Sequence, residues 1–93
     1  MSIRVIVLPM FREAAEGASA VDIRDCRTVG ECLKRLRAQF PLLGKMLFDE
    51  GDSVSGSLNV LINGQSVGEG SDVVDQPVRD GDEICPLMVI GGG

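Results

Sequence analysis

The chain has 93 residues, a formal net charge of -5 at pH 7 and no histidine. A chain of this size has room for one sheet and one packed helix but not for a deep active site, so we expect a single domain over residues 1–93. The acidic balance disfavours nucleic acid as a partner. With no apolar run approaching a membrane span and no signal-peptide pattern at the start, we expect a cytoplasmic protein with no membrane partner.

The three cysteines, Cys26, Cys32 and Cys85, form no CxxC motif. Because histidine is absent as well, zinc sites of the usual spacing and histidine-dependent catalytic triads are excluded, and we expect no metal site. Structural disulfides are not expected in a cytoplasmic chain, so we predict that all three cysteines are small buried apolar residues. The ionisable residues show no convergent set, so we do not expect the chain to be an enzyme.

The first third of the chain predicts a β-hairpin. Ile3 to Leu8 is short and rich in branched residues, and its two apolar faces suit a central strand. Residues 11–17 form a connection that ends in glycine. Ser19 to Cys26 then alternates apolar Val21 and Ile23 with charged residues, which is typical of a half-exposed strand.

An amphipathic helix follows the hairpin. Thr28 and Glu31 have the spacing of a capping box, and Pro41 stops the pattern. Residues 42–48 are expected to add a short second helical segment. The apolar residues between cap and stop recur at helical spacing and comprise Val29, Cys32, Leu33, Leu36 and Phe40.

After a polar loop over residues 49–56, the second half of the chain predicts another hairpin and a final strand. Leu58 to Ile62 reads as a strand, and Asn63-Gly64 is a strong hairpin signal before a short return strand, Gln65 to Val67. Asp80-Gly81-Asp82 forms another turn before the last strand, which begins at Glu83. Pro86 cannot donate to a central ladder, so we expect regular pairing to loosen there.

This order of elements predicts an α+β fold of the β-grasp, ubiquitin-like kind. The expected sheet is mixed, has about five strands and carries one main helix across one face. Its first and last strands should lie side by side and parallel in the middle of the sheet.

The end of the sequence, from about residue 87 to 93, is predicted to be a flexible tail. Leu87, Met88, Val89 and Ile90 are unusually apolar for a free end, and they either continue the last strand or anchor the chain to a partner. Gly91, Gly92 and Gly93 follow them. Because glycines lack Cβ atoms, they can thread a narrow slot in another protein.

The chemistry that suits such a tail is activation of its terminal carboxylate. A carboxylate is a poor electrophile, and conversion to an acyl-adenylate with ATP supplies a good leaving group that a sulfur nucleophile can displace. The group that would react is the carboxylate of Gly93. The chain would bind no cofactor, since the ATP would be used by the partner enzyme.

These features together resemble the MoaD/ThiS sulfur carriers, over the whole length of the chain. The segments that carry the likeness are Phe11-Arg12-Glu13, Thr28-Val29, Asn59-Val60-Leu61-Ile62-Asn63-Gly64, Pro77-Val78-Arg79-Asp80-Gly81-Asp82-Glu83 and the terminal glycines. The chain departs from the family's usual end, in which two glycines follow a proline-rich stretch.

The resemblance implies two classes of protein partner. An E1-like enzyme of the MoeB/ThiF type would adenylate Gly93, and a persulfide donor would convert it to a thiocarboxylate. The sulfur would then pass to an acceptor such as the large subunit of molybdopterin synthase, a thiazole synthase or a cysteine synthase. Residues 11–13 favour the molybdopterin branch, whereas the long segment from 42 to 58 looks more like the cysteine-synthesis or archaeal modifier branches.

Two alternatives remain open from the sequence. A ubiquitin-like modifier would use the same tail chemistry but join its last glycine to lysines of target proteins. A non-covalent β-grasp interaction module would make no chemical use of the glycines.

Overall fold

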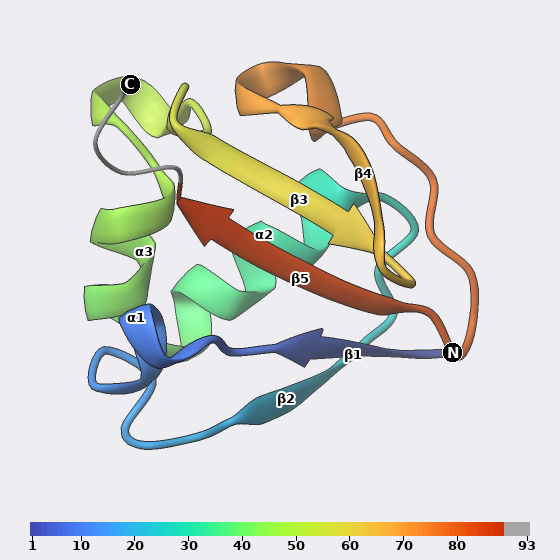
Figure 1. Cartoon of the computed structure of the whole chain (residues 1–93), viewed down its shortest axis with the longest axis horizontal. Helices are drawn as coiled ribbons and strands as arrows, with labels where there is room; N and C mark the ends of the chain where they lie inside the picture. Colours follow the sequence, from blue (N-terminus) through green and yellow to red (C-terminus); the bar gives the residue numbers. More distant parts are fainter. Residues whose placement is uncertain (89–93) are drawn as a thin grey trace.

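The computed structural model describes residues 1–88, which form one mixed sheet with helices packed on it (Figure 1). The strand order is β2-β1-β5-β3-β4, with β5 in the centre, parallel to β1 and antiparallel to β3. This is the predicted β-grasp arrangement. The strands are β1 (Ser2–Ile6), β2 (Ala20–Arg24), β3 (Leu58–Ile62), β4 (Gln65–Glu69) and β5 (Glu83–Met88).

The main helix, α2, crosses one face of the sheet and is drawn behind the strands in Figure 1. It spans Val29–Gln39 and is followed directly by α3 (Pro41–Leu47), so both predicted helical segments are confirmed. A further short helix, α1 (Pro9–Arg12), and two 3₁₀ turns, η1 (Glu50–Asp52) and η2 (Gly70–Val73), were not predicted. No helix within residues 1–88 is long and apolar enough to cross a membrane.

The hydrophobic core lies between the sheet and α2. Alternate residues of β1 and its continuation (Ile3, Val5 and Val7) are buried, because successive strand side chains point to opposite faces. They pack in one cluster with the inner face of α2, including Leu33 and Leu36. Phe11 of α1 is buried in the same cluster.

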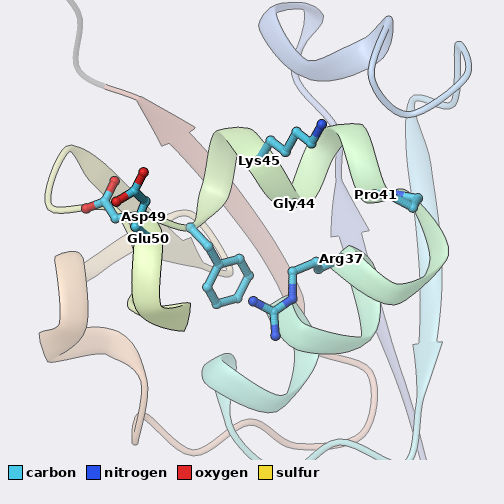
Figure 2. Close-up of a pocket in the computed structure, with 7 residues that line it drawn as sticks. Arg37, Pro41, Gly44, Lys45, Asp49 and Glu50 are labelled. Carbon is cyan, nitrogen blue, oxygen red and sulfur yellow. The ribbon is translucent and has the colours of Figure 1, made fainter.

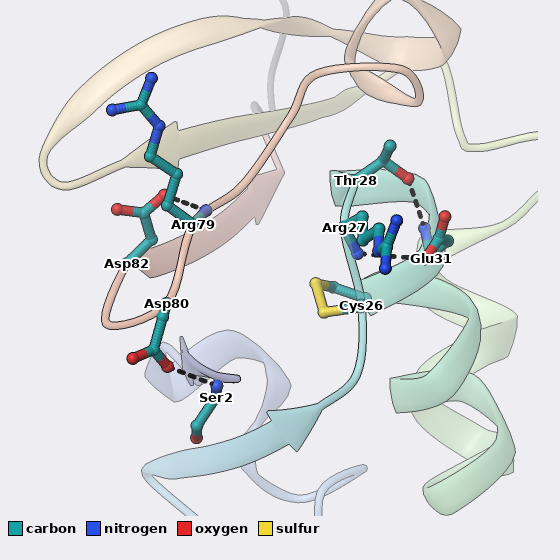
Figure 3. Close-up of a disulfide and its surroundings, with 9 residues drawn as sticks. Ser2, Cys26, Arg27, Thr28, Glu31, Arg79, Asp80 and Asp82 are labelled. Carbon is teal, nitrogen blue, oxygen red and sulfur yellow. Dashed lines mark hydrogen bonds between the residues drawn. A yellow bond between two sulfur atoms is a disulfide. The ribbon is translucent and has the colours of Figure 1, made fainter.

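The start of α2 is fixed by the predicted capping box (Figure 3). The Thr28 Oγ1 accepts the Glu31 backbone N–H at 3.2 Å, which satisfies one of the unpaired donors at the helix start. The Glu31 carboxylate reaches back to the backbone N–H of Arg27 at 3.0 Å, one residue before the cap. The reciprocal pair holds the β2–α2 connection against the helix.

A disulfide joins Cys26 to Cys32 across this same connection, with their Cα atoms 5.5 Å apart (Figure 3). Our expectation that these cysteines are unpaired was therefore wrong, although both are fully buried as expected. The expectation rested on the redox compartment alone. It missed the fact that Cys26, two residues after the end of β2, lies beside the first turn of α2 at a Cα separation suited to a disulfide.

We expect reduction of this disulfide to lower the free energy of unfolding by about 2 kcal/mol. The bridge closes a loop of only seven residues, so it restricts the unfolded chain modestly. Urea unfolding with and without a reductant measures the difference.

Two matched variants assign that effect to the bridge. A Cys85→Ser variant should keep the full response to reductant, because Cys85 is unpaired. A Cys26→Ala/Cys32→Ala variant should lose the response entirely. A wild-type chain equally stable in both conditions would contradict a stabilising bridge.

Pairing around Pro86 differs between the two sides of β5. The recorded pairing with β1 ends at Val5 opposite Ile84, whereas pairing with β3 continues past Pro86 to Met88. The Glu83 carbonyl accepts from Asn63 on the β3 side, so by alternation the nitrogen of Pro86 faces β1. The predicted loosening is thus confirmed toward β1 and wrong toward β3, where no donor is missing.

Candidate functional site

The candidate site is the end of β5 and the sheet surface around it. The central strand runs to Met88, where it lies opposite Leu58 of β3. Residues 89–93 lie outside the described part of the chain, so the roles predicted for Val89, Ile90, Gly91, Gly92 and Gly93 remain predictions. The structure therefore defines the base from which these last five residues start.

Leu87 and Met88, the two described members of the predicted docking segment, face opposite sides of the sheet. Met88 is half-buried and packs against the hydrophobic core. Leu87 is also half-buried but alternates with it, and lies opposite Asn59 of β3. Of these two residues, Leu87 is on the surface that a partner protein can cover.

Leu87 belongs to a half-buried apolar strip on the side of the sheet away from α2. We call this strip, formed by Ile6, Leu61, Cys85 and Leu87, the open face. Leu61 and Cys85 are directly paired across β3 and β5. Ile6 and Leu61 were not among the predicted site residues, although both alternate with buried neighbours along their strands.

The thiol of Cys85 is free and half-buried on the open face. Burial raises the pKa of this thiol above its ordinary value, because the thiolate is less well solvated there. Since the thiolate is the reactive form, the environment makes Cys85 a weaker nucleophile than an exposed cysteine.

The entry to β5 is held by a side-chain network around Asp82. Its carboxylate accepts the Arg79 backbone N–H at 2.8 Å and the Asn63 side-chain amide at 3.0 Å. These hydrogen bonds, the backbone bond first, lower the pKa of Asp82. The Asn63 amide oxygen also accepts the Glu83 N–H at 2.9 Å, so the β3–β4 turn fixes where β5 begins.

A surface hollow of about 450 Å³ lies beside α3, and its lining includes Arg37, Gly44 and Phe48 (Figure 2). Arg37 crosses it, with its guanidinium carbon 4.2 Å from the centre of the Phe48 ring and its Nη1 2.8 Å from Asp52. Gly44 leaves room for this path, because a Cβ there would overlap the Arg37 side chain. The arrangement clamps α2, α3 and η1 together, and its arginine is already engaged within the chain.

Within residues 1–88, no group of three or more histidine, cysteine, aspartate or glutamate side chains is placed to hold a metal ion. The described residues present the open face and the end of β5, and the predicted reactive residue, Gly93, lies beyond them.

Comparisons with known proteins agree with the geometry. SAMP1 from Haloferax volcanii superposes with a TM-score of 0.83 at 24% identity, covering all of both chains. The small archaeal modifier protein 1 from Methanosarcina acetivorans gives 0.82 at 28% identity, covering 99% of this chain and 96% of the other. The BexX/CysO complex of Amycolatopsis orientalis gives 0.78 at 22% identity, covering 98% and 99%. A comparison with curated protein sequences found no match.

The family comparison covers nearly the whole chain. The ThiS family model matches residues 5–93, which include the open face, all of β5 and the three terminal glycines. The family recognised from the sequence segments is thus confirmed, and this small sulfur carrier-like chain belongs to the ThiS family.

Proposed function

We propose that the chain is a sulfur carrier whose reactive group is the carboxylate of Gly93. The observation that carries this proposal is the family match, which continues through Gly93. The central strand supports it, because β5 delivers the last residues from the middle of the sheet beside an apolar open face. The chain supplies the acyl group, and separate proteins supply the catalysis.

The reaction begins with transfer of AMP from ATP to the Gly93 carboxylate by an E1-like enzyme of the MoeB/ThiF type, with release of pyrophosphate. A persulfide sulfur then attacks the acyl carbon and AMP leaves. A second thiol cleaves the resulting acyl disulfide and releases the thiocarboxylate. That sulfur passes to an acceptor enzyme in molybdopterin-type or related biosynthesis.

Cys85 is the competing place to carry sulfur on this chain, as a persulfide. Its burial and raised pKa disfavour that role. The terminal carboxylate needs no thiolate on the carrier, so the proposed mechanism leaves Cys85 as part of the open face.

The experiment that tests the proposal incubates the chain with an E1-like enzyme from its own organism, ATP and a persulfide donor. Mass spectrometry should show a gain of about 16 Da, since sulfur replaces one oxygen of an activated acyl group. The fragment that gains this mass should contain Gly93. A gain of about 32 Da that maps to Cys85 would instead show a persulfide carrier, because a persulfide adds a whole sulfur atom to the thiol.

A second function, modification of target lysines, is favoured by one specific likeness. The Methanosarcina acetivorans relative, at 28% identity, is described as a modifier protein. The two functions separate at the last nucleophile. After incubation with the activating enzyme, ATP and cell extract, a modifier leaves an isopeptide-linked Gly93 on target lysines, whereas a dedicated carrier leaves none.

A further inference from the structure

A group of exposed apolar side chains lies on α1 and α3, away from the open face. Met10, Leu42 and Met46 are 42%, 64% and 39% exposed, and within residues 1–88 only Met1 is a comparably exposed large apolar residue. All three line one surface hollow of about 270 Å³, together with Glu13 and Ala14. We call these five residues the α1–α3 patch.

Helix α3 has apolar residues on two faces, one buried in the core and one exposed in the patch. Leu43 and Leu47 are buried and supply the inner face of the helix. Leu42 and Met46, also four residues apart, form a second apolar ridge on the outer face. Single exposed apolar residues are ordinary, but a ridge that meets a methionine from another helix around a hollow is a contiguous surface of the kind that binds proteins.

The patch lies at the end of the sheet from which the last residues depart. Strands β1 and β5 are parallel, with Arg4 opposite Glu83 and Val5 opposite Ile84. Continuing that register places Pro9, the first residue of α1, level with Met88. Figure 1 shows α1 and α3 beside the arrowheads of β1 and β5, while the N-terminus lies at the far end.

The reach of the tail limits where its partner can bind. Five residues follow Met88 and, fully extended, they span at most about 18 Å. A protein that holds the Gly93 carboxylate in its active site must therefore lie against this end of the sheet. The α1–α3 patch is the exposed apolar surface of the described residues at that end.

We propose that the α1–α3 patch docks the enzyme that adenylates Gly93, in addition to any contact that enzyme makes with the open face. The inference rests on the proposed function, in which adenylation precedes every later fate of the tail. The enzyme's matching surface is an apolar projection that fills the hollow, next to a basic side chain that faces Glu13. A basic side chain on the enzyme also suits a carrier whose net charge is -5.

The test measures steady-state pyrophosphate release by the E1-like enzyme that modifies the unaltered chain, as a function of carrier concentration. Leu42→Asp should raise KM for the carrier about ten-fold or more, because it places a charge in an apolar contact, with kcat nearly unchanged. Met46→Gln, a second variant, should raise KM in the same way. Leu42→Met should restore nearly normal KM, since it keeps the apolar volume.

The contribution of the Glu13 charge is tested with a matched pair of exposed glutamates, Glu13 and Glu83. Glu13→Lys should raise KM several-fold, and the effect should shrink at high salt. Glu83→Lys makes the same change at the opposite end of β5 and should leave KM nearly unchanged. Thermal unfolding checks that each variant is folded. We expect Leu42→Asp to fold, because Leu42 is exposed at the start of α3, where an acidic residue stabilises the helix.

The outcomes separate the two proposals. Pyrophosphate release by the unaltered chain, together with unchanged KM in folded Leu42→Asp and Met46→Gln variants, overturns the docking surface and leaves the carrier function standing. A chain that dimerises through the patch, with Leu42→Asp monomeric and its KM normal, assigns the patch to a second copy and also overturns the proposal. No adenylation of the unaltered chain overturns the carrier function, and the docking proposal with it.

Discussion

Removal of Gly92 and Gly93 should abolish thiocarboxylate formation while leaving binding to the adenylating enzyme nearly intact. The deletion withdraws the terminal carboxylate by about 7 Å, two residues of extended chain. Misplacement of a reacting group by even about 1 Å can cost about 10²-fold in rate, so the loss should be complete within detection. The shortened chain still contains the whole described structure, residues 1–88, so the docking surfaces persist.

Two measurements on the same variant make this result decisive. Calorimetric titration of the enzyme reports docking, and mass spectrometry after reaction with ATP and a persulfide donor reports chemistry. A variant without Gly93 alone, which moves the carboxylate by about 3.5 Å, should fall between the full chain and the double deletion. Normal thiocarboxylate formation by the double deletion would end the hypothesis that the terminal carboxylate reacts. Loss of docking would show that the glycines themselves supply most of the affinity.

Much of the fold can be predicted because single elements are marked by local sequence features, in the case of α2 by two independent ones. The helix α2 is predicted both by its apolar period and by its cap, and the structure contains the Thr28–Glu31 bond that the cap requires. The Asn63-Gly64 turn is likewise marked by residue type, and both residues have positive φ, 50° and 85°. Such elements depend on neighbours within a few residues, so they can be predicted from a single sequence.

The elements that were missed depend on short segments or on distant contacts. Helix α1 has only four residues, too few to show a helical period, and its one local signal is Pro9 at its start. Strand β4 continues to Glu69, beyond the predicted end at Val67, because an irregular register at Val60 and Leu61 accommodates Gly68 at φ 130°. The Cys26–Cys32 bridge joins residues only six apart in sequence but depends on the path of the β2–α2 connection, whereas the α1–α3 patch requires residues brought together by tertiary folding.

The candidate site also has parts that can be predicted from the sequence and parts that require the folded structure. Gly93 and its neighbours are predicted as site residues from composition, because a run of three glycines at that position is unusual. The open face is visible in the alternation of β5 and β3, once β5 is known to be central. The α1–α3 patch is not visible, because Met10 and Leu42 are far apart in sequence and only the folded chain brings both to the same hollow.

A large stability effect of a single methyl group is expected at Gly30, the second residue of α2. The first two N–H groups of this helix have no partner within it. Val29 donates to the Gln76 carbonyl at 2.9 Å, and Gly30 donates to the Val74 carbonyl at 3.0 Å. The segment before β5 is therefore drawn against the helix start, and a Cβ on Gly30 would lie 2.6 Å from Val74 Cγ1 and 2.8 Å from the Val74 carbonyl oxygen.

Gly30→Ala should therefore lower the free energy of unfolding by about 2–4 kcal/mol, as overpacking strains the contact and weakens the Gly30–Val74 hydrogen bond. Urea unfolding measures the change. Gly56→Ala is the control, because Gly56 is exposed, has no positive φ, and an added Cβ there would have nothing within 4 Å. Because the added methyl group meets no neighbour, the control should stay within about 1 kcal/mol of wild type.

A Gly30→Ala/Val74→Ala double variant then separates the two obstacles. Shortening Val74 removes Cγ1 but leaves its carbonyl oxygen where the helix start needs it, so we expect only partial recovery relative to Val74→Ala alone. Full recovery would mean that side-chain crowding is the whole effect and that the backbone approach tolerates alanine. A Gly30→Ala chain as stable as wild type would show that the 74–76 segment moves freely away from α2, contrary to the paired hydrogen bonds that hold it there.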